Sequence, residues 1–294
     1  MQTITELEAL RSTLAKLRAR RGSIALVPTM GALHEGHLTL VRRAREVADH
    51  VAVSIFVNPR QFGANEDLGA YPRQMARDSA LLEAEGAELL WAPPPEVVYP
   101  PGYATNISVA GVSEGLCGGD RPGHFDGVAT VVCKLFNQVM PDMAFFGEKD
   151  WQQLAVIRRM ARDLDLTRPD AAAIHGVAIV REDDGLAMSS RNAYLSAQQR
   201  AAAAALPRAM KDALAAIAAG APASETLGNL HDTLMTGGFD LLDYAELRDA
   251  DNLAPLAHDN GNARLFVAAR IGGTRLIDNM AVEGLERVRG IEPL

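Results

Sequence analysis

Short apolar runs alternate with amphipathic segments from the N-terminus to about residue 180. The runs at 23–27 and 51–57 are almost wholly apolar, as in strands buried on both faces of a sheet. Between such runs, apolar residues recur every three or four positions, which is the period of a helix packed on one side. Alternating strands and helices are typical of βαβ units. The pattern therefore predicts an α/β fold, a parallel sheet with helices on both faces.

The individual elements follow from these runs and from the residues that interrupt them. Four leucines between residues 7 and 17 share one face and predict a first helix, with Thr3 near its start and Gly22 past its end. Pro28 is expected to end the strand at 23–27. The other strands are predicted near 51–57, 88–91, 142–146 and 172–180, and the other helices near 36–49, 71–86, 127–140 and 151–163.

The pattern changes after Asn192. An Ala-rich helix is predicted at about 197–219 with Ser196 as its cap, followed by a shorter helix capped by Ser224. Strand-like runs at 239–248, 265–270 and 274–281 follow, and Gly272-Gly273 signals a hairpin between the last two. We therefore expect two domains, a larger one at residues 1–180 and a smaller α+β domain at 181–294.

Composition and charge narrow the class of protein. The chain has 294 residues, with 29 Lys and Arg against 37 Asp and Glu, and no basic block that would favour nucleic-acid binding. No apolar stretch approaches the length of a membrane span, and the N-terminus lacks the features of a secretory signal. Cys117 and Cys133 cannot form a disulfide framework. We expect a soluble cytoplasmic protein that binds neither nucleic acid nor membrane.

The most informative segment joins the strand at 23–27 to the next helix and contains His34-Glu-Gly-His37. Residues three apart on a helix lie about 60° from each other, so the two imidazoles share a face. The N-terminus of a helix favours an anion, which suits a phosphate. Alternatively, one histidine caps the helix and the other is solvated. The spacing is not His-Glu-x-x-His, and the glycine fingerprints of dinucleotide and P-loop binding do not occur in the chain.

Two later segments carry similar chemistry. After the strand at 142–146, Lys149 offers a charge for a phosphate and Asp150 an acceptor for ribose hydroxyls, although a surface turn explains these residues equally well. The segment 181–192 at the domain joint has little apolar surface and is expected to be a mobile lid. Its Ser189, Ser190 and Arg191 are donors suited to a polyphosphate. Three such segments at one face of a parallel sheet favour nucleotide chemistry over a purely structural role.

Taken together, these motifs resemble the pantothenate synthetases (pantoate–β-alanine ligases), a family of the HIGH-motif nucleotidylyltransferase superfamily. The likeness extends from near Ile4 to near Ala281. Residues 28–37 resemble the family's HIGH motif, and residues 56–63 resemble its pantoate-binding turn. The other matching motifs are 71–73, 121–127, 146–150 with Gln153, and 188–192.

The resemblance implies a Rossmann-like domain that binds nucleotide and pantoate, followed by a smaller lid domain. It also implies a two-step reaction. The carboxylate of pantoate attacks the α-phosphate of ATP to give pantoyl adenylate and pyrophosphate, and the amine of β-alanine then displaces AMP to give pantothenate. Mg²⁺ with ATP and a homodimeric assembly are further implications of the family. None of these follows from composition or spacing.

The same resemblance assigns roles to individual residues. His37 takes the position of the proton donor, and Asp78 is a candidate magnesium ligand. Arg60 and Trp151 depart slightly from the family's usual residues without touching a proposed catalytic group. The implied catalytic residues are His34, His37, Lys149, Ser189 and Arg191. The implied ATP site comprises Met30, Gly31, Ala32, Leu33, His34, Glu35, Gly36, His37, Gly147, Glu148, Lys149, Asp150, Val180, Met188, Ser189, Ser190 and Arg191. Gln61 and Gln153 are implied to bind pantoate, and Gln61 also β-alanine.

Three rival functions are open at this point. A plain nucleotidylyltransferase of the same superfamily would move AMP to a phosphate-bearing acceptor and would need a cationic acceptor pocket, whereas Gln61 and Gln153 are uncharged. A non-catalytic nucleotide sensor would bind ATP without needing paired histidines. A Rossmann oxidoreductase lacks its glycine fingerprint.

Overall fold

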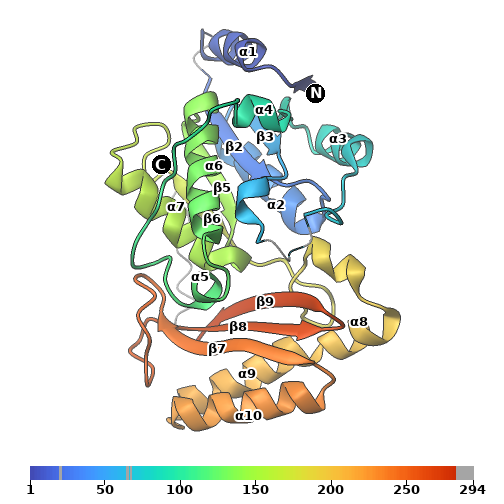
Figure 1. Ribbon diagram of the computed structural model, residues 1–294, viewed down its shortest axis with the longest axis vertical. Coiled ribbons are helices and arrows are strands. Elements are labelled where there is room, and N and C mark those ends of the chain that lie inside the picture. The colour runs from blue at the N-terminus through green and yellow to red at the C-terminus, as the bar shows by residue number, and fades with distance from the viewer. Residues whose placement is uncertain (20–21, 64–65, 67, 283–294) are drawn as a thin grey trace. The chain divides into compact units, whose positions relative to one another are not determined.

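The computed structural model describes all residues except 20–21, 64–65, 67 and 283–294. By the contacts between residues, the chain divides into two compact units (Figure 1). The first comprises Met1–Val180 and Met188–Ser190, and the second comprises Arg181–Ala187 and the chain from Arg191 onward. Each unit has its own secondary structure and its own core.

The first unit is built on a six-stranded sheet in the order β1-β4-β3-β2-β5-β6. Every pair of neighbouring strands in it is parallel. Since β2 lies between β3 and β5, the sheet extends to both sides of its central strand, as in a doubly wound fold. The strands are β1 (Gln2–Ile4), β2 (Ile24–Thr29), β3 (His50–Ile55), β4 (Leu89–Trp91), β5 (Met143–Gly147) and β6 (Ile174–Val177).

Both faces of this sheet are apolar, and each packs on helices. Val27 and Val53 belong to a core that includes Val41 of α2 and Leu82 of α3. On the other face, the indole N–H of Trp91 donates to Gln138 of α6 at 3.0 Å. These contacts confirm the predicted parallel sheet with helices on both faces. The helices are α1 (Leu7–Ala19), α2 (Glu35–Val47), α3 (Met75–Ala84), α4 (Pro95–Val98), α5 (Leu116–Asp120), α6 (His124–Val139) and α7 (Trp151–Asp163).

The second unit consists of helices packed on an antiparallel sheet, as the α+β pattern predicts. The sheet has the order β7-β8-β9, and the two glycines between β8 and β9 have φ of +57° and +77°, which suits a tight hairpin. Its core joins apolar residues of α9 and α10 to those of β8. The elements are α8 (Ala197–Ala203), α9 (Ala205–Ala218), α10 (Ala223–Thr236), β7 (Leu241–Asp249), β8 (Ala263–Ile271) and β9 (Thr274–Ala281).

Two expectations about prolines are wrong. Pro28 lies inside β2, opposite Ser54 of β3. Pairing of β2 with β5 ends at Leu26, so the missing N–H of Pro28 falls beyond that ladder. The Ala-rich helix is not continuous, because α8 ends at Ala203 and α9 begins at Ala205. This interruption places Pro207 in the first turn of α9, where a proline is tolerated.

The starts of two helices also differ from expectation. Thr3 is part of β1 rather than a cap, and α1 begins at Leu7. Ser224 is inside α10, whose cap position is held by Pro222 in an extended conformation. The short elements β1, α4 and α5 have three to five residues each and leave no recognisable period in the sequence.

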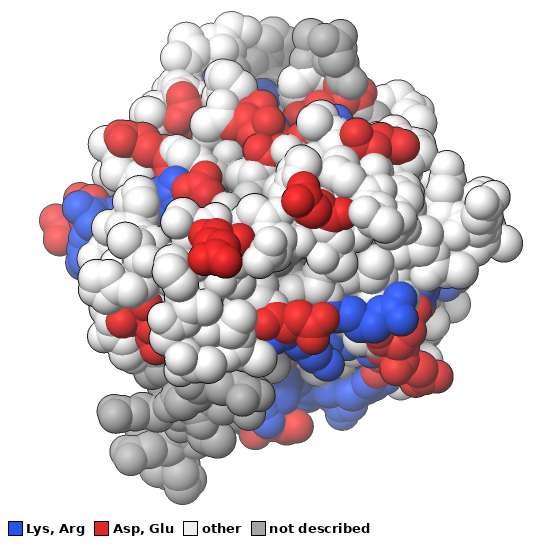
Figure 2. Space-filling view, turned by 90° about the horizontal axis from the view of Figure 1, so that it is seen from below, with Lys and Arg blue, Asp and Glu red and all other residues white. Residues whose placement is uncertain are grey.

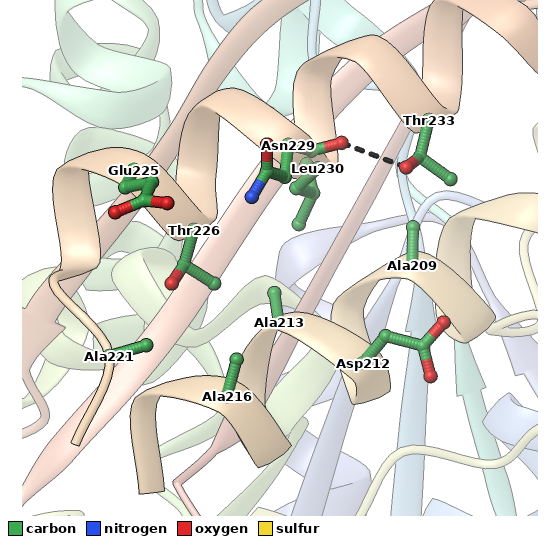
Figure 3. A pocket seen from close by; sticks show the side chains of 10 residues that line it. All are labelled: Ala209, Asp212, Ala213, Ala216, Ala221, Glu225, Thr226, Asn229, Leu230 and Thr233. Atoms are coloured by element: carbon green, nitrogen blue, oxygen red, sulfur yellow. Dashed lines mark hydrogen bonds between the residues drawn. The ribbon is translucent and has the colours of Figure 1, made fainter. Parts of the chain in front are cut away.

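Figure 2 shows one face of the molecule, and Figure 3 shows a cavity of the second unit. On the face in Figure 2, basic side chains have acidic ones beside them and form no continuous patch. In the second unit, a cavity of about 270 Å³ lies between α9 and α10 (Figure 3). Alanines of α9, including Ala209, Ala213 and Ala216, form much of its wall. Among the described helices, none is both long enough and apolar enough to cross a membrane.

Candidate active site

Three of the predicted motifs lie at the same edge of the sheet. They follow the carboxyl ends of β2, β3 and β5, which are neighbouring parallel strands. The chain after β2 turns into α2, the chain after β3 forms the short helix η1 (Pro59–Gln61), and the chain after β5 forms η2 (Glu148–Asp150). Ligands of open α/β sheets bind at this edge. The topology therefore brings the histidine, glutamine and lysine motifs together.

The segment 30–37, hereafter the histidine turn, has an unusual backbone. Gly31 and Ala32 have φ of +83° and +51°, so two successive residues are left-handed. Their conformation is supported by hydrogen bonds to side chains. The Gly31 N–H donates to the hydroxyl of Thr29 at 3.2 Å, and the N–H groups of Ala32 and Leu33 donate to the carboxylate of Asp78 at 2.8 and 2.9 Å. The turn is therefore fixed by the chain's own acceptors.

The two histidines lie in contact at the start of α2. Their ring centroids are 4.1 Å apart, and the backbone N–H of His34 donates to Nδ1 of His37 at 3.3 Å. Burial, together with the charges of His34 and Lys149, lowers the pKa of His37 to about 3. His37 is therefore neutral at pH 7, with Nδ1 as acceptor and Nε2–H as donor. The positive charge of Lys149 is one of the causes of this lower pKa.

Gln61, the predicted pantoate ligand, lies beside the histidine turn. Its Nε2 donates to the sulfur of Met30 at 2.9 Å, and its Oε1 accepts from Nδ2 of Asn58 at 3.1 Å. Asn58 is 1% exposed and also donates to the carbonyl of Gly127 at 3.0 Å. A Cβ on Gly127 would lie 2.3 Å from the carbonyl oxygen of Arg60, so only glycine lets α6 approach this turn. The amide of Gln61 is thus positioned by both neighbouring segments.

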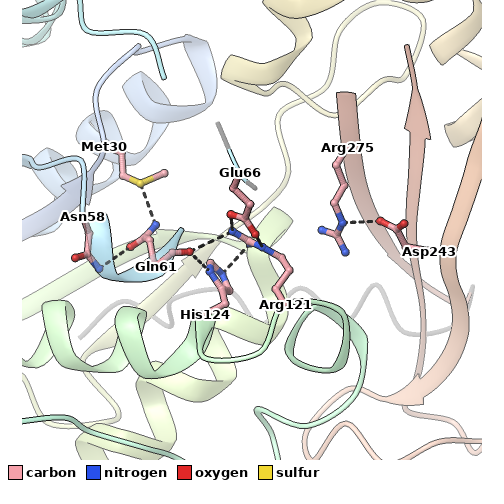
Figure 4. A network of polar contacts seen from close by, with 8 residues as sticks. All are labelled: Met30, Asn58, Gln61, Glu66, Arg121, His124, Asp243 and Arg275. Carbon is pink, nitrogen blue, oxygen red and sulfur yellow. Dashed lines mark hydrogen bonds and ion pairs between the residues drawn. The ribbon is translucent and has the colours of Figure 1, made fainter. Parts of the chain in front are cut away.

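A second network contacts the backbone of the turn that carries Gln61 (Figure 4). No role was predicted from the sequence for the side chains that form it. Arg121 donates to both oxygens of Glu66 at 2.7 and 2.5 Å and to the backbone carbonyl of Gln61 at 3.3 Å. It also contacts Nε2 of His124 at 3.1 Å, and Nδ1 of His124 lies 2.8 Å from the same carbonyl of Gln61. Arginine can only donate, so Nε2 of His124 is the acceptor and Nδ1–H donates to Gln61.

This arrangement disfavours a charged His124. Burial, and then the charge of Arg121, lowers its pKa to about 4. For Glu66, burial alone would raise the pKa, but the hydrogen bonds and charge of Arg121 lower it below its usual value. The network therefore holds a neutral imidazole between an ion pair and the turn that carries Gln61.

We expect this buried histidine to make the protein acid-sensitive. The unfolded chain binds a proton at His124 below about pH 6.5 but the folded chain does so only near pH 4, so stability is lost as the pH falls across that window. A shift of this size corresponds to about 2 kcal/mol between pH 7 and pH 5. Urea unfolding at both pH values measures the loss, and His124→Gln should reduce it by that amount. The control His231→Gln alters an exposed histidine of α10 and should leave the loss unchanged. Equal acid sensitivity in all three proteins would contradict the assignment.

The glutamines at the start of α7 have different surroundings. Gln152 is 5% exposed and serves the fold, because its side chain accepts from the N–H of Cys117 at 3.0 Å and donates to the carbonyl of Val112 at 3.2 Å. Gln153, the predicted pantoate ligand, is partly exposed in the first turn of the same helix. Just before this helix, Nζ of Lys149 lies 3.8 Å from Oδ2 of Asp150. Gln153 is therefore accessible to a ligand, whereas the side chain of Gln152 is buried and bonded to the backbone.

Part of the segment 181–192 belongs to the first unit. Met188 donates to the carbonyl of Val180 at 3.0 Å, and the hydroxyls of Ser190 and Tyr71 lie 3.3 Å apart. Val180 is also near the histidine turn, since a Cβ on Gly36 would lie 4.0 Å from the Cβ of Val180. Val180, Met188 and Ser190 are therefore held within the unit that carries the histidines.

The rest of this segment is anchored in the second unit. Arg181 donates to both oxygens of Asp278 at 2.7 and 2.9 Å, and Asp278 is 2% exposed. Leu186 is buried in the core of that unit. The expectation that 181–192 has little to anchor it is therefore wrong for Arg181–Ala187. Arg191 also belongs to the second unit.

Asp78 does not fit the metal role that the resemblance implies. It is 1% exposed in the first turn of α3, and each of its oxygens already accepts a backbone N–H of the histidine turn. Mg²⁺ requires ligand oxygens directed at the ion in near-octahedral geometry. Within the described part of the chain, no group of three or more His, Cys, Asp or Glu side chains is placed to hold a metal.

Comparison with known proteins agrees with this geometry. The family model for pantoate-β-alanine ligase matches residues 2–281. The chain belongs to this family. A pantothenate synthetase of Novosphingobium aromaticivorans is 65% identical over 96% of this chain and 99% of its own length. A second one, from Sphingopyxis alaskensis, is 61% identical over 96% of this chain and all of its own length.

Solved structures of the pantoate–β-alanine ligase family have the same fold. The crystal structure of pantothenate synthetase from Thermus thermophilus has a TM-score of 0.89 and 45% identity, covering 96% of this chain and 99% of that one. The ligase of Francisella tularensis, complexed with β,γ-ATP and β-alanine, has a TM-score of 0.81 and 31% identity, covering 96% of this chain and 98% of that one. The fold of this chain is thus that of an established ligase family.

Proposed function

We propose that this chain joins pantoate to β-alanine in an ATP-dependent reaction that passes through pantoyl adenylate and releases AMP and pyrophosphate. Membership of the pantoate–β-alanine ligase family over residues 2–281 supports the overall reaction. The observation that carries the proposal is the hydrogen bond between Gln61 and Met30, which joins the turn at residues 56–63 to the histidine turn. A carboxylate held by Gln61 would thus lie next to the phosphates.

In the first step, a carboxylate oxygen of pantoate bonds to the α-phosphorus of ATP and the bond to pyrophosphate breaks. Negative charge accumulates on the phosphate oxygens, so the enzyme's main contribution is electrostatic. We assign that contribution to His34, His37 and Lys149, whose proximity is indicated by the ring contact and by the effect of Lys149 on the pKa of His37. Ser189 and Arg191, to which the resemblance gives catalytic roles, belong to the same proposed set.

The neutral state of His37 defines how it acts. With a pKa of about 3 it carries no extra proton at pH 7, and its Nδ1 is occupied by the N–H of His34. Its Nε2–H can therefore stabilise a phosphate oxygen by hydrogen bonding without transferring a proton. This differs from the proton-donor role that the resemblance implies.

In the second step, the amine of β-alanine attacks the acyl carbon, AMP leaves with the bonding electrons, and the amine gives up a proton to solvent. Gln61 and Gln153 are assigned to pantoate, because an amide can accept from its hydroxyls and donate to its carboxylate without charge repulsion. Gln61 is assigned to β-alanine as well. The F. tularensis ligase forms a complex with β,γ-ATP and β-alanine, which supports a nucleotide and β-alanine as ligands of this chain.

The remaining assignments concern the metal ion, the two domains, the assembly and the location of the enzyme. We propose that Mg²⁺ enters as a complex with the phosphates of ATP, since Mg²⁺ commonly retains waters and substrate oxygens. No step above depends on a protein-held metal. The first unit is assigned to nucleotide and pantoate, residues 181–294 act as a lid domain, and the enzyme is a cytoplasmic homodimer. The lid domain and the homodimer rest on the family resemblance, and the cytoplasmic location is the expectation from the sequence.

A rapid-quench experiment with the substrates omitted in turn tests the function. Enzyme with ATP and pantoate alone should release about one equivalent of pyrophosphate per site and then slow, because the adenylate is retained. Adding β-alanine should restart turnover and yield AMP with pantothenate. A concerted reaction predicts no pyrophosphate until β-alanine is present. AMP transfer to a phosphate-bearing acceptor with no dependence on pantoate would favour the plain nucleotidylyltransferase.

A further inference from the structure

We propose that Asp78 is a positioning residue for this reaction, whose carboxylate holds the backbone of the histidine turn so that His34 and His37 are in place before ATP binds. The inference rests on the proposed function for its catalytic consequence. It does not rest on it for the geometry, which belongs to the free protein. It also replaces the metal-binding role that does not fit.

The contacts of Asp78 are those of a clamp. Its Oδ2 accepts the N–H of Ala32 at 2.8 Å and its Oδ1 accepts the N–H of Leu33 at 2.9 Å. The side chain comes from α3, far along the sequence, and is 1% exposed. A Cβ on Gly31 would lie 3.1 Å from its Oδ2, so the carboxylate also fits closely against the glycine before the clamped residues. One side chain of α3 thereby fixes two successive residues of the turn and lies close to a third.

The clamped backbone is one that needs outside support. Ala32 has a Cβ and a φ of +51°, a conformation that a non-glycine residue rarely adopts without compensating contacts. Successive backbone N–H groups in a turn can point toward one place and create a concavity that attracts anions. In this chain the anion in that concavity is the carboxylate of Asp78. The concavity is therefore filled by the protein itself.

At this site, the backbone N–H groups of the histidine turn and its side chains have different roles. The N–H groups of Gly31, Ala32, Leu33 and His34 each have an acceptor within the chain, namely Thr29, Asp78 or His37. A phosphate at this edge is therefore met by side chains rather than by these amides. The position of the two imidazoles then decides transition-state stabilisation, and that position depends on the turn that Asp78 holds.

The test uses Asp78→Asn, which keeps the size of the side chain but presents an NH₂ group to a backbone donor. We expect kcat to fall by about thirtyfold, as for a small displacement of catalytic groups. The KM for ATP and the half-saturating Mg²⁺ concentration should change less than threefold. In ¹⁵N-histidine-labelled enzyme free of ATP and metal, the imidazole signals of His37 should shift, because its bond to the N–H of His34 is disturbed. The matched control Glu83→Gln alters an exposed carboxylate on the same helix and should change none of these readouts.

Thr29→Val provides an independent variant that involves no carboxylate. It removes the acceptor for the N–H of Gly31, and we expect the same His37 signals to shift with a smaller loss of kcat. This variant decides the matter if Asp78→Asn does not fold. Unchanged imidazole signals in the folded variants would overturn the proposal. So would a tenfold or larger rise in half-saturating Mg²⁺ with kcat restored at high Mg²⁺, which is the behaviour of a metal ligand. Failure of the proposed function is distinguished because it would appear in the wild-type enzyme, as missing pyrophosphate, and leave the imidazole signals untouched.

Discussion

Replacing His37 by alanine is expected to lower kcat at least about a hundredfold with little loss of stability. The imidazole is the neutral donor next to Lys149, and removal of one such donor from an electrostatic site costs two to three orders of magnitude (roughly 10²–10³) in turnover. Its side chain accepts one hydrogen bond, from the N–H of His34 at 3.3 Å, and its ring contacts that of His34, so we expect its contribution to the fold to be small. Steady-state kinetics measure the first effect, and thermal unfolding should show a shift of only a few degrees.

The control for this variant is His258→Ala, which alters an exposed histidine of the second unit and should leave kcat unchanged. The pH profile gives a further check. Since the pKa of His37 is about 3, we expect no decline in wild-type kcat from this residue between pH 6 and 9. If His37 had to donate an extra proton, kcat would fall about tenfold per pH unit above its pKa. A His37→Ala enzyme with normal kcat and a much lower melting temperature would show that the residue is structural.

The layered fold could be predicted from the sequence because its signals are local. Strands buried on both faces, such as β3, consist of apolar runs, and amphipathic helices such as α2 show their period directly. Short elements carry too few residues for a period. β1 is recognisable only through its pairing with β4, which is about 85 residues away in the sequence.

Helix boundaries are harder to predict where local signals conflict. The alanines at the end of α8 and the start of α9 favour one continuous helix, but Pro207 lacks an N–H and its ring would clash with the carbonyl four residues earlier. The helix restarts so that this proline lies in a first turn. The proline is visible in the sequence, but helix propensity alone gives its effect too little weight.

The candidate site divides in a similar way. The histidine pair was predictable, since a buried strand, a glycine turn and a helix start place it at a ligand-binding edge. The role of Asp78 was not, because a carboxylate that binds a metal and one that accepts two amides have the same appearance in a sequence. The pair of Glu66 and Arg121 joins residues 55 apart. The motif at 121–127 was a signal for Arg121, but nothing near Glu66 indicated its partner.

Replacing Gln61 by glutamate is expected to raise the KM for pantoate at least about a hundredfold. The variant keeps the length of the side chain but places a negative charge where a substrate carboxylate is proposed to bind. In a partly buried site, two like charges about 4 Å apart repel by about 4 kcal/mol at an effective dielectric constant near 20, which is more than a hundredfold in affinity. The turn itself should persist, because Arg121 and His124 hold it through the backbone carbonyl of Gln61, which the substitution leaves in place.

The Gln61→Glu substitution should affect nucleotide binding much less than pantoate binding. Binding of a non-hydrolysable ATP analogue, measured by calorimetry, is expected to change less than threefold, because the histidines and Lys149 are unaltered. Gln198→Glu introduces the same charge on an exposed position of α8 and should leave the KM for pantoate unchanged, which separates a local effect from a change in net charge. Gln61→Ala removes the amide without adding a charge, so its effect on the KM for pantoate should be smaller than that of the glutamate. If Gln61→Glu and Gln61→Ala raise the KM for pantoate equally, the substrate carboxylate does not lie beside this side chain. The acceptor half of the proposed site must then be placed nearer Gln153, since that residue is the other partly exposed amide assigned to pantoate.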